Sequence, residues 1–157
     1  MQYSKHAFYQ DPMVFYARVN SSFTWNNNYD LLKGMHIGVT RGWSYGQRFD
    51  QNKPNLSLEP VGTVKANFQK LVTGRIDLLA SHPRSAARVM EEMQIEDDIK
   101  MLLPPITINK GYFGFSRKKN LDDFIFRFDQ EFEKMVESKE IIQLSKKYNL
   151  DYTNIHQ

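Results

Sequence analysis

The spacing of hydrophobic residues along the chain switches repeatedly between the period of a strand and the period of a helix. Runs of β-forming residues predict strands at 13–19, 35–39, 56–61, 76–80, 99–103 and 112–115. We expect the strand over 99–103 to stop at the Pro104-Pro105 pair. Strands that alternate with helices at this spacing indicate a parallel or mixed α/β sheet.

Helical spacing of apolar residues appears between the predicted strands. Thr63 is a suitable N-cap for a helix that runs through Thr73, and Gly74 is a suitable stop. A second helix is expected from Ser85 to Met93.

The C-terminal third of the chain predicts two further helices. Asn120 is a suitable N-cap, and Asp122 and Asp123 follow in the first turn, where carboxylates suit the helix dipole. The next helix is expected to start near Ser138. The first of these helices carries a wide apolar stripe, which we interpret as core: Leu121, Phe124, Ile125, Phe128, Phe132, Met135 and Val136.

The segment Thr40-Arg41-Gly42-Trp43-Ser44 stands where the strand over 35–39 gives way to a helix. Gly42 permits a tight turn at this point. Ser44 is a plausible N-cap, whose hydroxyl and neighbouring backbone N–H groups could hold an anion. The turn is therefore the first candidate binding element.

Composition excludes several classes of function. The chain of 157 residues has 41 % hydrophobic and 25 % charged residues, which suits one folded domain or slightly more. It has no cysteine, which excludes disulfides, thiolate zinc sites and a cysteine nucleophile. The net charge of +3 is modest, and the basic run Arg117-Lys118-Lys119 is soon followed by acidic residues, so we expect no nucleic-acid partner. The four histidines are scattered, so we expect no metal site.

Targeting signals are not visible. Residues 2–10 lack a basic start followed by an apolar segment, so no signal peptide is recognised. No apolar stretch reaches the length of about 18 residues that spans a bilayer.

Three motifs stand in order along the chain: the turn Gly42-Trp43-Ser44, the segment Leu71–Asp77, and the ending Ile141–Leu144 with Lys147-Tyr148. Together they resemble the bacterial extracytoplasmic solute-binding proteins that serve polar amino-acid ABC transporters. The resemblance implies a type II periplasmic-binding-protein-like α/β fold, with one complete Rossmann-like lobe around a central mixed sheet. Hinge strands and C-terminal helices would belong to a partial second lobe, and most of the N-terminal lobe would lie outside this chain.

The resemblance also implies domain boundaries. Residues 1–20 would be the end of lobe one and the first hinge strand, and residues 21–110 would be lobe two. Residues 111–157 would hold the return hinge strand and the closing helices of lobe one. Tyr3-Ser4 is similar to the aromatic-Ser pair that precedes the first crossover in the family.

Six solute contacts in lobe two follow from the resemblance: Thr40, Arg41, Trp43, Ser44, Tyr45 and His82. Ser44 keeps a hydroxyl that the family uses on the ligand carboxylate, whereas the Trp43 indole could stack on the ligand or simply fill the lobe surface. Arg41 could face an anionic ligand or solvent. His82 stands where the family commonly has a carboxylate for the ligand's α-ammonium. A neutral imidazole accepts one hydrogen bond without a fixed charge, and a structural role beside Pro83 is the alternative.

The function implied by the resemblance is non-enzymatic solute binding in the periplasm, without a cofactor. A small polar amino-acid-like solute would bind between two lobes and pass to an ABC permease. A dehydratase-like enzyme of the same fold and a sensor module of a signalling receptor are the alternatives. With most of one lobe outside the chain, binding is expected to be weak, and the apolar helices are expected to form a homodimer.

Overall fold

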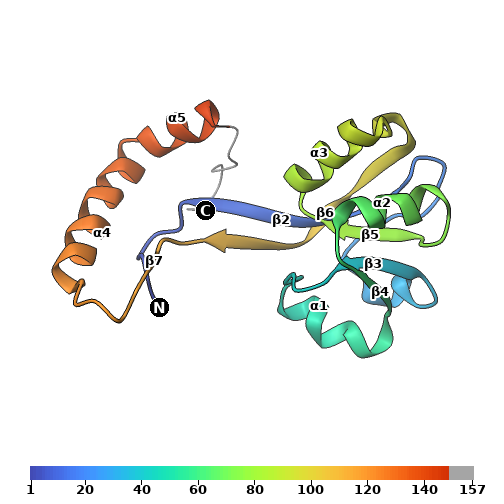
Figure 1. Cartoon of the computed structure of the whole chain (residues 1–157), viewed down its shortest axis with the longest axis horizontal. Helices are drawn as coiled ribbons and strands as arrows, with labels where there is room; N and C mark the ends of the chain where they lie inside the picture. The colour runs from blue at the N-terminus through green and yellow to red at the C-terminus, as the bar shows by residue number, and fades with distance from the viewer. Residues whose placement is uncertain (149–157) are drawn as a thin grey trace. The chain divides into compact units, whose positions relative to one another are not determined.

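The computed structural model describes residues 1–148, which divide into two compact units. Unit 1 combines Met1–Asp11 with the chain from Asn109 onward, and unit 2 is Pro12–Ile108 (Figure 1). The assignment of residues 1–20, 21–110 and 111–157 to lobes and hinges stays a prediction. Residues 149–157, which it places with the closing helices, lie outside the described residues.

A five-stranded mixed sheet forms the centre of unit 2. Its order is β4 (Ser57–Val61), β3 (His36–Thr40), β5 (Leu78–Ser81), β2 (Tyr9–Arg18) and β6 (Ile99–Gly111). Strand β3 runs parallel to both β4 and β5, whereas β2 runs antiparallel to β5. Because β3 and β5 are parallel neighbours, their carboxyl ends meet at one edge of the sheet.

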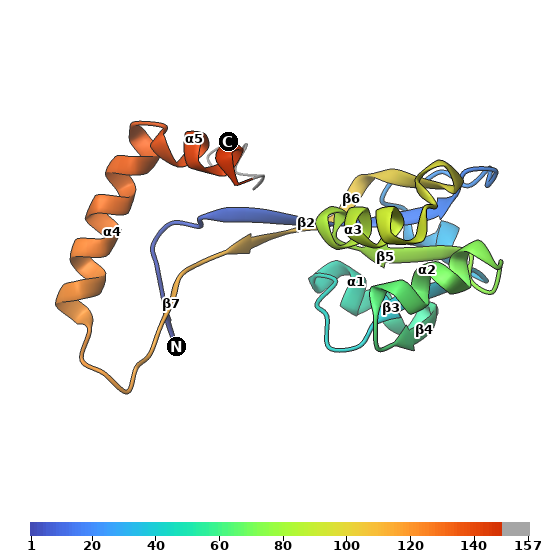
Figure 2. The ribbon, with the colours of Figure 1, turned by 45° about the horizontal axis from the view of Figure 1, so that its top comes forward.

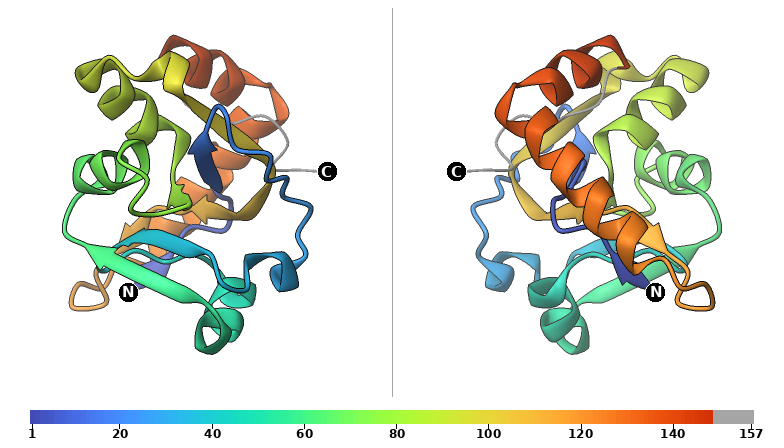
Figure 3. Two further views of the ribbon diagram at one scale, coloured as in Figure 1. Left: turned by 90° about the vertical axis from the view of Figure 1, so that its right-hand side faces the viewer. Right: turned by 90° about the vertical axis from the view of Figure 1, so that its left-hand side faces the viewer.

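Helices cover both faces of this sheet. The helices α2 (Val64–Val72) and α3 (Pro83–Met93) lie side by side on one face, away from α1 (Gln47–Asn52) (Figure 3). Short 3-10 helices lie at Tyr29–Leu32, Lys53–Asn55 and Glu96–Asp98. The predicted cap of α2 is confirmed, because the Thr63 hydroxyl accepts a hydrogen bond from the Ala66 N–H.

Alternation along β2 separates two cores. Met13 and Phe15 pack into the core on the α1 face, and Val14 and Tyr16 pack into the core under α2 and α3. Trp25 joins the first core, with its ring centroid 5.0 Å from that of Phe15. Trp25 lies outside every strand and helix that the sequence predicted, so this segment contributes a core residue that we did not predict.

Tyr16 makes the stability of unit 2 depend on pH. Burial raises the pKa of Tyr16 from 10.0 to about 12. Between these two values the unfolded chain releases the phenolic proton while the folded chain retains it, so we expect stability to fall as the pH rises. The loss should approach about 2–3 kcal/mol, and Tyr16→Phe should reduce it. Urea unfolding of the unsubstituted and Tyr16→Phe proteins, between the two pKa values, measures the effect. The same dependence of the free energy of unfolding on pH in both proteins would contradict the prediction.

Unit 1 consists of a small sheet and two helices. Strand β1 (Gln2–Tyr3) pairs antiparallel with β7 (Gly114–Phe115), followed by α4 (Asp122–Glu137) and α5 (Glu140–Lys147) (Figure 2). The buried Ser4 connects the segment after β1 to the segment before β7, because its N–H donates to the Phe113 carbonyl oxygen at 2.9 Å. No helix within residues 1–148 is long and apolar enough to cross a membrane.

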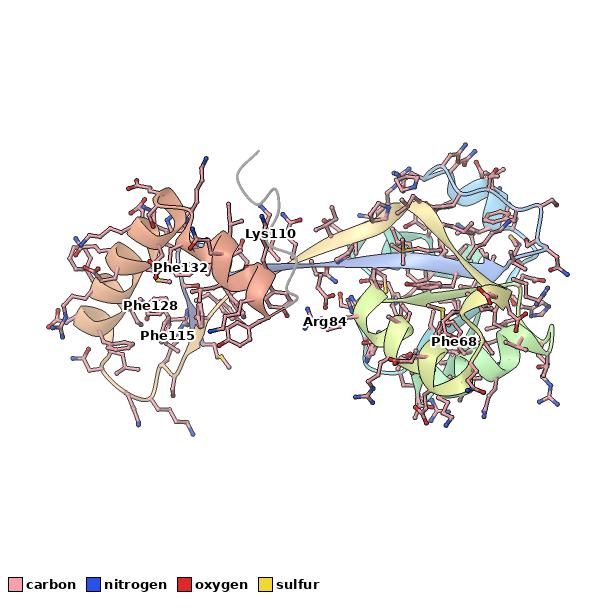
Figure 4. The ribbon with its side chains drawn as sticks, turned by 90° about the horizontal axis from the view of Figure 1, so that it is seen from above. Phe68, Arg84, Lys110, Phe115, Phe128 and Phe132 are labelled. Atoms are coloured by element: carbon pink, nitrogen blue, oxygen red, sulfur yellow. The ribbon has the colours of Figure 1, made fainter. Side chains whose placement is uncertain are left out.

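The predicted apolar stripe of α4 is largely covered within unit 1. Phe132 is buried, and Phe128 lies between its ring and that of Phe115 (Figure 4). Phe124 remains 51 % exposed. The stripe is therefore core over most of its length, and fewer apolar residues are left exposed than the sequence suggested.

Three sequence predictions in the fold were wrong in detail. Strand β6 continues through Pro104-Pro105 to Gly111, because it is an edge strand, where a missing N–H is tolerated. Asn120 does not cap α4, since the N-cap position falls on Leu121. Ser138 is the C-cap of α4, and α5 starts at Glu140.

Candidate functional site

The turn that follows β3 is the first element of the candidate site. Gly42 has a positive φ of 79°, which supports the predicted role of glycine in this turn. The Trp43 N–H donates to the Thr40 carbonyl oxygen at 3.3 Å, and the Arg41 N–H donates to the Val61 carbonyl oxygen at 2.9 Å. Backbone hydrogen bonds therefore fix the turn to the ends of β3 and β4.

Tyr45 holds the turn from inside the protein. Its side chain is buried, and its hydroxyl oxygen accepts a hydrogen bond from the Thr40 N–H at 2.6 Å. Its ring centroid lies 5.0 Å from that of Phe49 in α1. Burial raises the pKa of Tyr45, and its hydrogen bonds to Thr40 oppose that shift. Tyr45 thus positions the turn.

Removing the Tyr45 hydroxyl should destabilise the turn. We expect Tyr45→Phe to lower the free energy of unfolding by about 1–3 kcal/mol, because the Thr40 N–H loses its acceptor inside the core. Tyr29→Phe is the matched control, since the buried Tyr29 hydroxyl has no hydrogen-bond partner among the described residues. Urea denaturation compares the two variants. An equal loss in both would show that the hydrogen bond contributes nothing.

Ser44 does not cap a helix, contrary to the sequence prediction. Helix α1 begins at Gln47, and its N-cap is Gly46, with a φ of 90°. The backbone at Gly46 passes close to β6, since an added Cβ would lie 2.7 Å from the Thr107 Cβ. Because the Tyr45 side chain is buried and the backbone at Gly46 approaches β6, the helix begins only at Gln47. Ser44 is therefore left exposed in the turn. A contact between its hydroxyl and a solute stays a prediction.

Trp43 and His82 meet at the carboxyl ends of neighbouring parallel strands. Trp43 follows β3 and His82 follows β5, and their ring centroids lie 5.0 Å apart at an angle of 44°. The His82 Nδ1 lies 3.2 Å from the Pro12 carbonyl oxygen. A carbonyl oxygen only accepts, so Nδ1 is the donor in this hydrogen bond. The structure therefore brings together two residues that stand far apart in the sequence.

A pocket of about 320 Å³ opens beside the turn. Its lining includes the predicted residues Thr40, Arg41, Trp43 and Tyr45, together with residues of α1, the adjoining 3-10 helix and β4: Phe49, Lys53, Leu58 and Pro60. The latter group was not predicted, because no motif marks its members and only the fold places them beside the turn. The mixture of apolar walls and a few polar groups is typical of a small-molecule site.

Two polar side chains at this pocket are left without a polar partner within residues 1–148. The Thr40 hydroxyl is buried without a hydrogen-bond partner among the described residues. The Arg41 side chain is exposed and forms no ion pair with any residue in the described part of the chain. These groups suit a ligand with hydrogen-bond acceptors or negative charge. No group of three or more potential metal ligands occurs within residues 1–148.

Comparison with solved structures identifies the fold. ArgBP from T. maritima, as a mutant, matches with a TM-score of 0.68 and 15 % identity over 93 % of this chain and 60 % of its own. A second match is a structure from work on glutathione import via GshT and the cystine ABC importer TcyBC of Streptococcus mutans. It has a TM-score of 0.64 and 22 % identity, over 93 % of this chain and 61 % of its own. The GluR0 ligand-binding core from Nostoc punctiforme, in complex with L-glutamate, matches with a TM-score of 0.65 and 12 % identity, over 92 % and 63 %.

These matches show that the chain has the type II periplasmic-binding-protein-like α/β fold, as the sequence predicted. At these identities the likeness shows the fold alone. The chain spans about 60 % of the length of the first of these structures. No protein-family model and no curated protein sequence matches it.

Proposed function

We propose that this chain is a solute-binding component, or part of one, of an ABC-type importer in the periplasm. The observation that carries the proposal is the meeting of Trp43 and His82 at the carboxyl ends of β3 and β5, beside the pocket of the turn. In open α/β sheets, ligands bind outside the carboxyl ends of parallel strands. Solved proteins of this fold include the substrate-binding protein of an amino acid ABC transporter.

The solute that fits this edge is small, polar and amino-acid-like. Arg41 would pair with its carboxylate, and the hydroxyls of Thr40 and Ser44 would donate hydrogen bonds to the same group. The Trp43 indole would pack on an apolar or planar part of the solute. His82 would contact the solute through its ring, and Tyr45 would keep the turn in place.

The affinity of these contacts should be low. Micromolar binding requires about 8 kcal/mol. A charge-assisted hydrogen bond contributes about 1.5–3 kcal/mol, before the cost of association is subtracted. The few contacts offered by the turn and His82 therefore predict a millimolar dissociation constant for this chain. In the proposed importer, contacts from a further lobe would strengthen binding before delivery to the permease.

Tryptophan fluorescence of the full chain tests the proposal. Trp43 is partly exposed at the turn, whereas Trp25 is buried, so a bound solute should mainly change the emission of Trp43. The panel should include arginine, L-glutamate, glutathione and cystine, which the names of the matched structures contain. We expect at least one solute to give a saturable change with a millimolar midpoint.

Matched histidine variants show whether the change arises at the proposed edge. His82→Gln should weaken binding about tenfold, since it removes one hydrogen-bonding group and the ring packed on Trp43. His36→Gln is the control, because His36 lies at the opposite, amino end of β3. Equal weakening in both variants, or no saturable change with any solute, would overturn the proposal.

We also propose that two copies associate through the exposed part of α4. Phe124 and Phe126 are 51 % and 65 % exposed, and exposed aromatic residues on one helix favour pairing. Light scattering at increasing concentration should show a dimer that Phe124→Ser with Phe126→Ser abolishes. A monomeric mass at every concentration would contradict this part of the proposal.

A further inference from the structure

A groove lies between α2 and α3, and neither the turn after β3 nor His82 is part of its lining. It has a volume of about 510 Å³. The lining comes from the start of α2 and from one face of α3: Thr63, Val64, Lys65, Arg84, Ser85, Arg88, Val89 and Glu92. None of these residues lines the pocket of the turn or was predicted as a solute contact. The groove is therefore a separate candidate site.

Two arginines give the groove its charge. Arg84 and Arg88 stand four residues apart on α3, so their side chains lie on the same side of the helix. Both are exposed, and neither guanidinium forms a hydrogen bond or ion pair with another residue in the described part of the chain. Two planar cations one helical turn apart are thus available to an anion.

Lys65 and Glu92 join the two walls of the groove. The Lys65 Nζ donates to the Glu92 Oε1 at 2.6 Å, across from α2 to α3. This hydrogen bond, with smaller help from the charge of Arg88, lowers the pKa of the Glu92 carboxyl, so Glu92 remains ionised at neutral pH. Glu92 therefore mainly offsets the charge of Lys65, and its interaction with Arg88 is smaller. With three basic residues and one acidic residue in its lining, the groove keeps an excess of positive charge.

We propose that this groove binds a phosphate group carried by a small organic molecule or a lipid headgroup. Guanidinium groups match the oxygens of phosphate with paired hydrogen bonds, and two of them suit a dianion better than a single carboxylate. The Ser85 hydroxyl is a further donor within the groove. Val64 and Val89 supply an apolar surface for the part of the ligand that carries the phosphate. The volume of the groove leaves room for this organic part of the ligand.

Titrations of the full chain test this assignment with three probes: inorganic phosphate, glucose 6-phosphate, and phosphatidylcholine vesicles with and without phosphatidic acid. Amide chemical shifts in the ¹H–¹⁵N spectrum report the binding of the two soluble probes, and co-sedimentation reports the binding of vesicles. Ionic strength is held constant, with sodium chloride as the reference, because exposed charges also attract anions without specificity. We expect millimolar binding of phosphate, with shifts at residues 63–65 and 84–92.

Charge-matched variants separate a site from general attraction. Arg84→Gln with Arg88→Gln should weaken phosphate binding about tenfold or more. Arg75→Gln with Arg127→Gln removes the same charge from exposed positions outside the groove and should leave binding unchanged. Circular dichroism confirms that both double variants fold.

The outcomes distinguish the ligand sources. Binding of glucose 6-phosphate above that of inorganic phosphate would assign the groove to soluble organic phosphates. Binding only to vesicles that contain phosphatidic acid, lost in the groove variant, would assign it to a lipid headgroup. Equal effects of chloride and phosphate, equal losses in both double variants, or no binding of any probe would overturn the proposal.

Discussion

Replacing Phe15 with alanine should lower the free energy of unfolding of unit 2 by about 3–5 kcal/mol. The Phe15 side chain is fully buried in the middle of β2. Its ring lies 5.0 Å from that of Trp25 at an angle of 87° and 6.5 Å from that of Phe49. The substitution removes apolar burial and aromatic contacts together, and leaves a cavity between the sheet and α1.

Urea denaturation followed by far-ultraviolet circular dichroism measures this loss. Val19→Ala is the control, because Val19 lies just beyond the end of β2 and is 55 % exposed. We expect a change of less than about 0.5 kcal/mol for the control. A similarly small change for Phe15→Ala would show that the core on the α1 face does not stabilise unit 2.

Phe132→Ala should unfold unit 1 while unit 2 stays folded. Phe132 is buried in the small core of unit 1, which it shares with Ala7 and Ile141. Its ring centroid lies 5.7 Å from that of Phe128 and 5.7 Å from that of Phe113. A loss of about 3–5 kcal/mol is comparable with the whole stability of such a small unit.

Native-state hydrogen exchange resolves the two units. In Phe132→Ala, the amides of α4 should lose protection, whereas those of β3 and β5 should keep it. Gln130→Ala is the control on the same helix, since Gln130 is exposed and lies outside the core of unit 1. Loss of protection throughout unit 2 would contradict the separation of the cores.

Local patterns made most of the fold predictable. The run of β-forming residues from Met13 onward predicted the strand β2, whose two faces enter different cores. The Thr63 cap was also visible, because a cap depends on residues that lie three positions apart. The continuation of β6 past Pro104 was not visible in the sequence, because whether a strand lies at the edge of a sheet depends on long-range pairing.

The candidate site was predictable only where it depends on the local sequence. The glycine turn at Gly42 follows from the local sequence, and its position after β3 is confirmed. The buried hydrogen bond between Tyr45 and Thr40 was not visible, because the inward direction of the Tyr45 side chain depends on Phe49 and the core. The contact between Trp43 and His82 depends on the pairing of β3 with β5, so the sequence marked both residues without showing that they touch.

Chemical-shift mapping of the full chain tests the central claim most directly. The claim is that the turn after β3 and the residues after β5 form one solute-binding edge. Titration with arginine, L-glutamate, glutathione and cystine should move the amides of residues 40–45 and 81–83 together, in a saturable manner, for at least one solute. Unchanged spectra with every solute, or saturable shifts that leave both segments unmoved, would contradict the account.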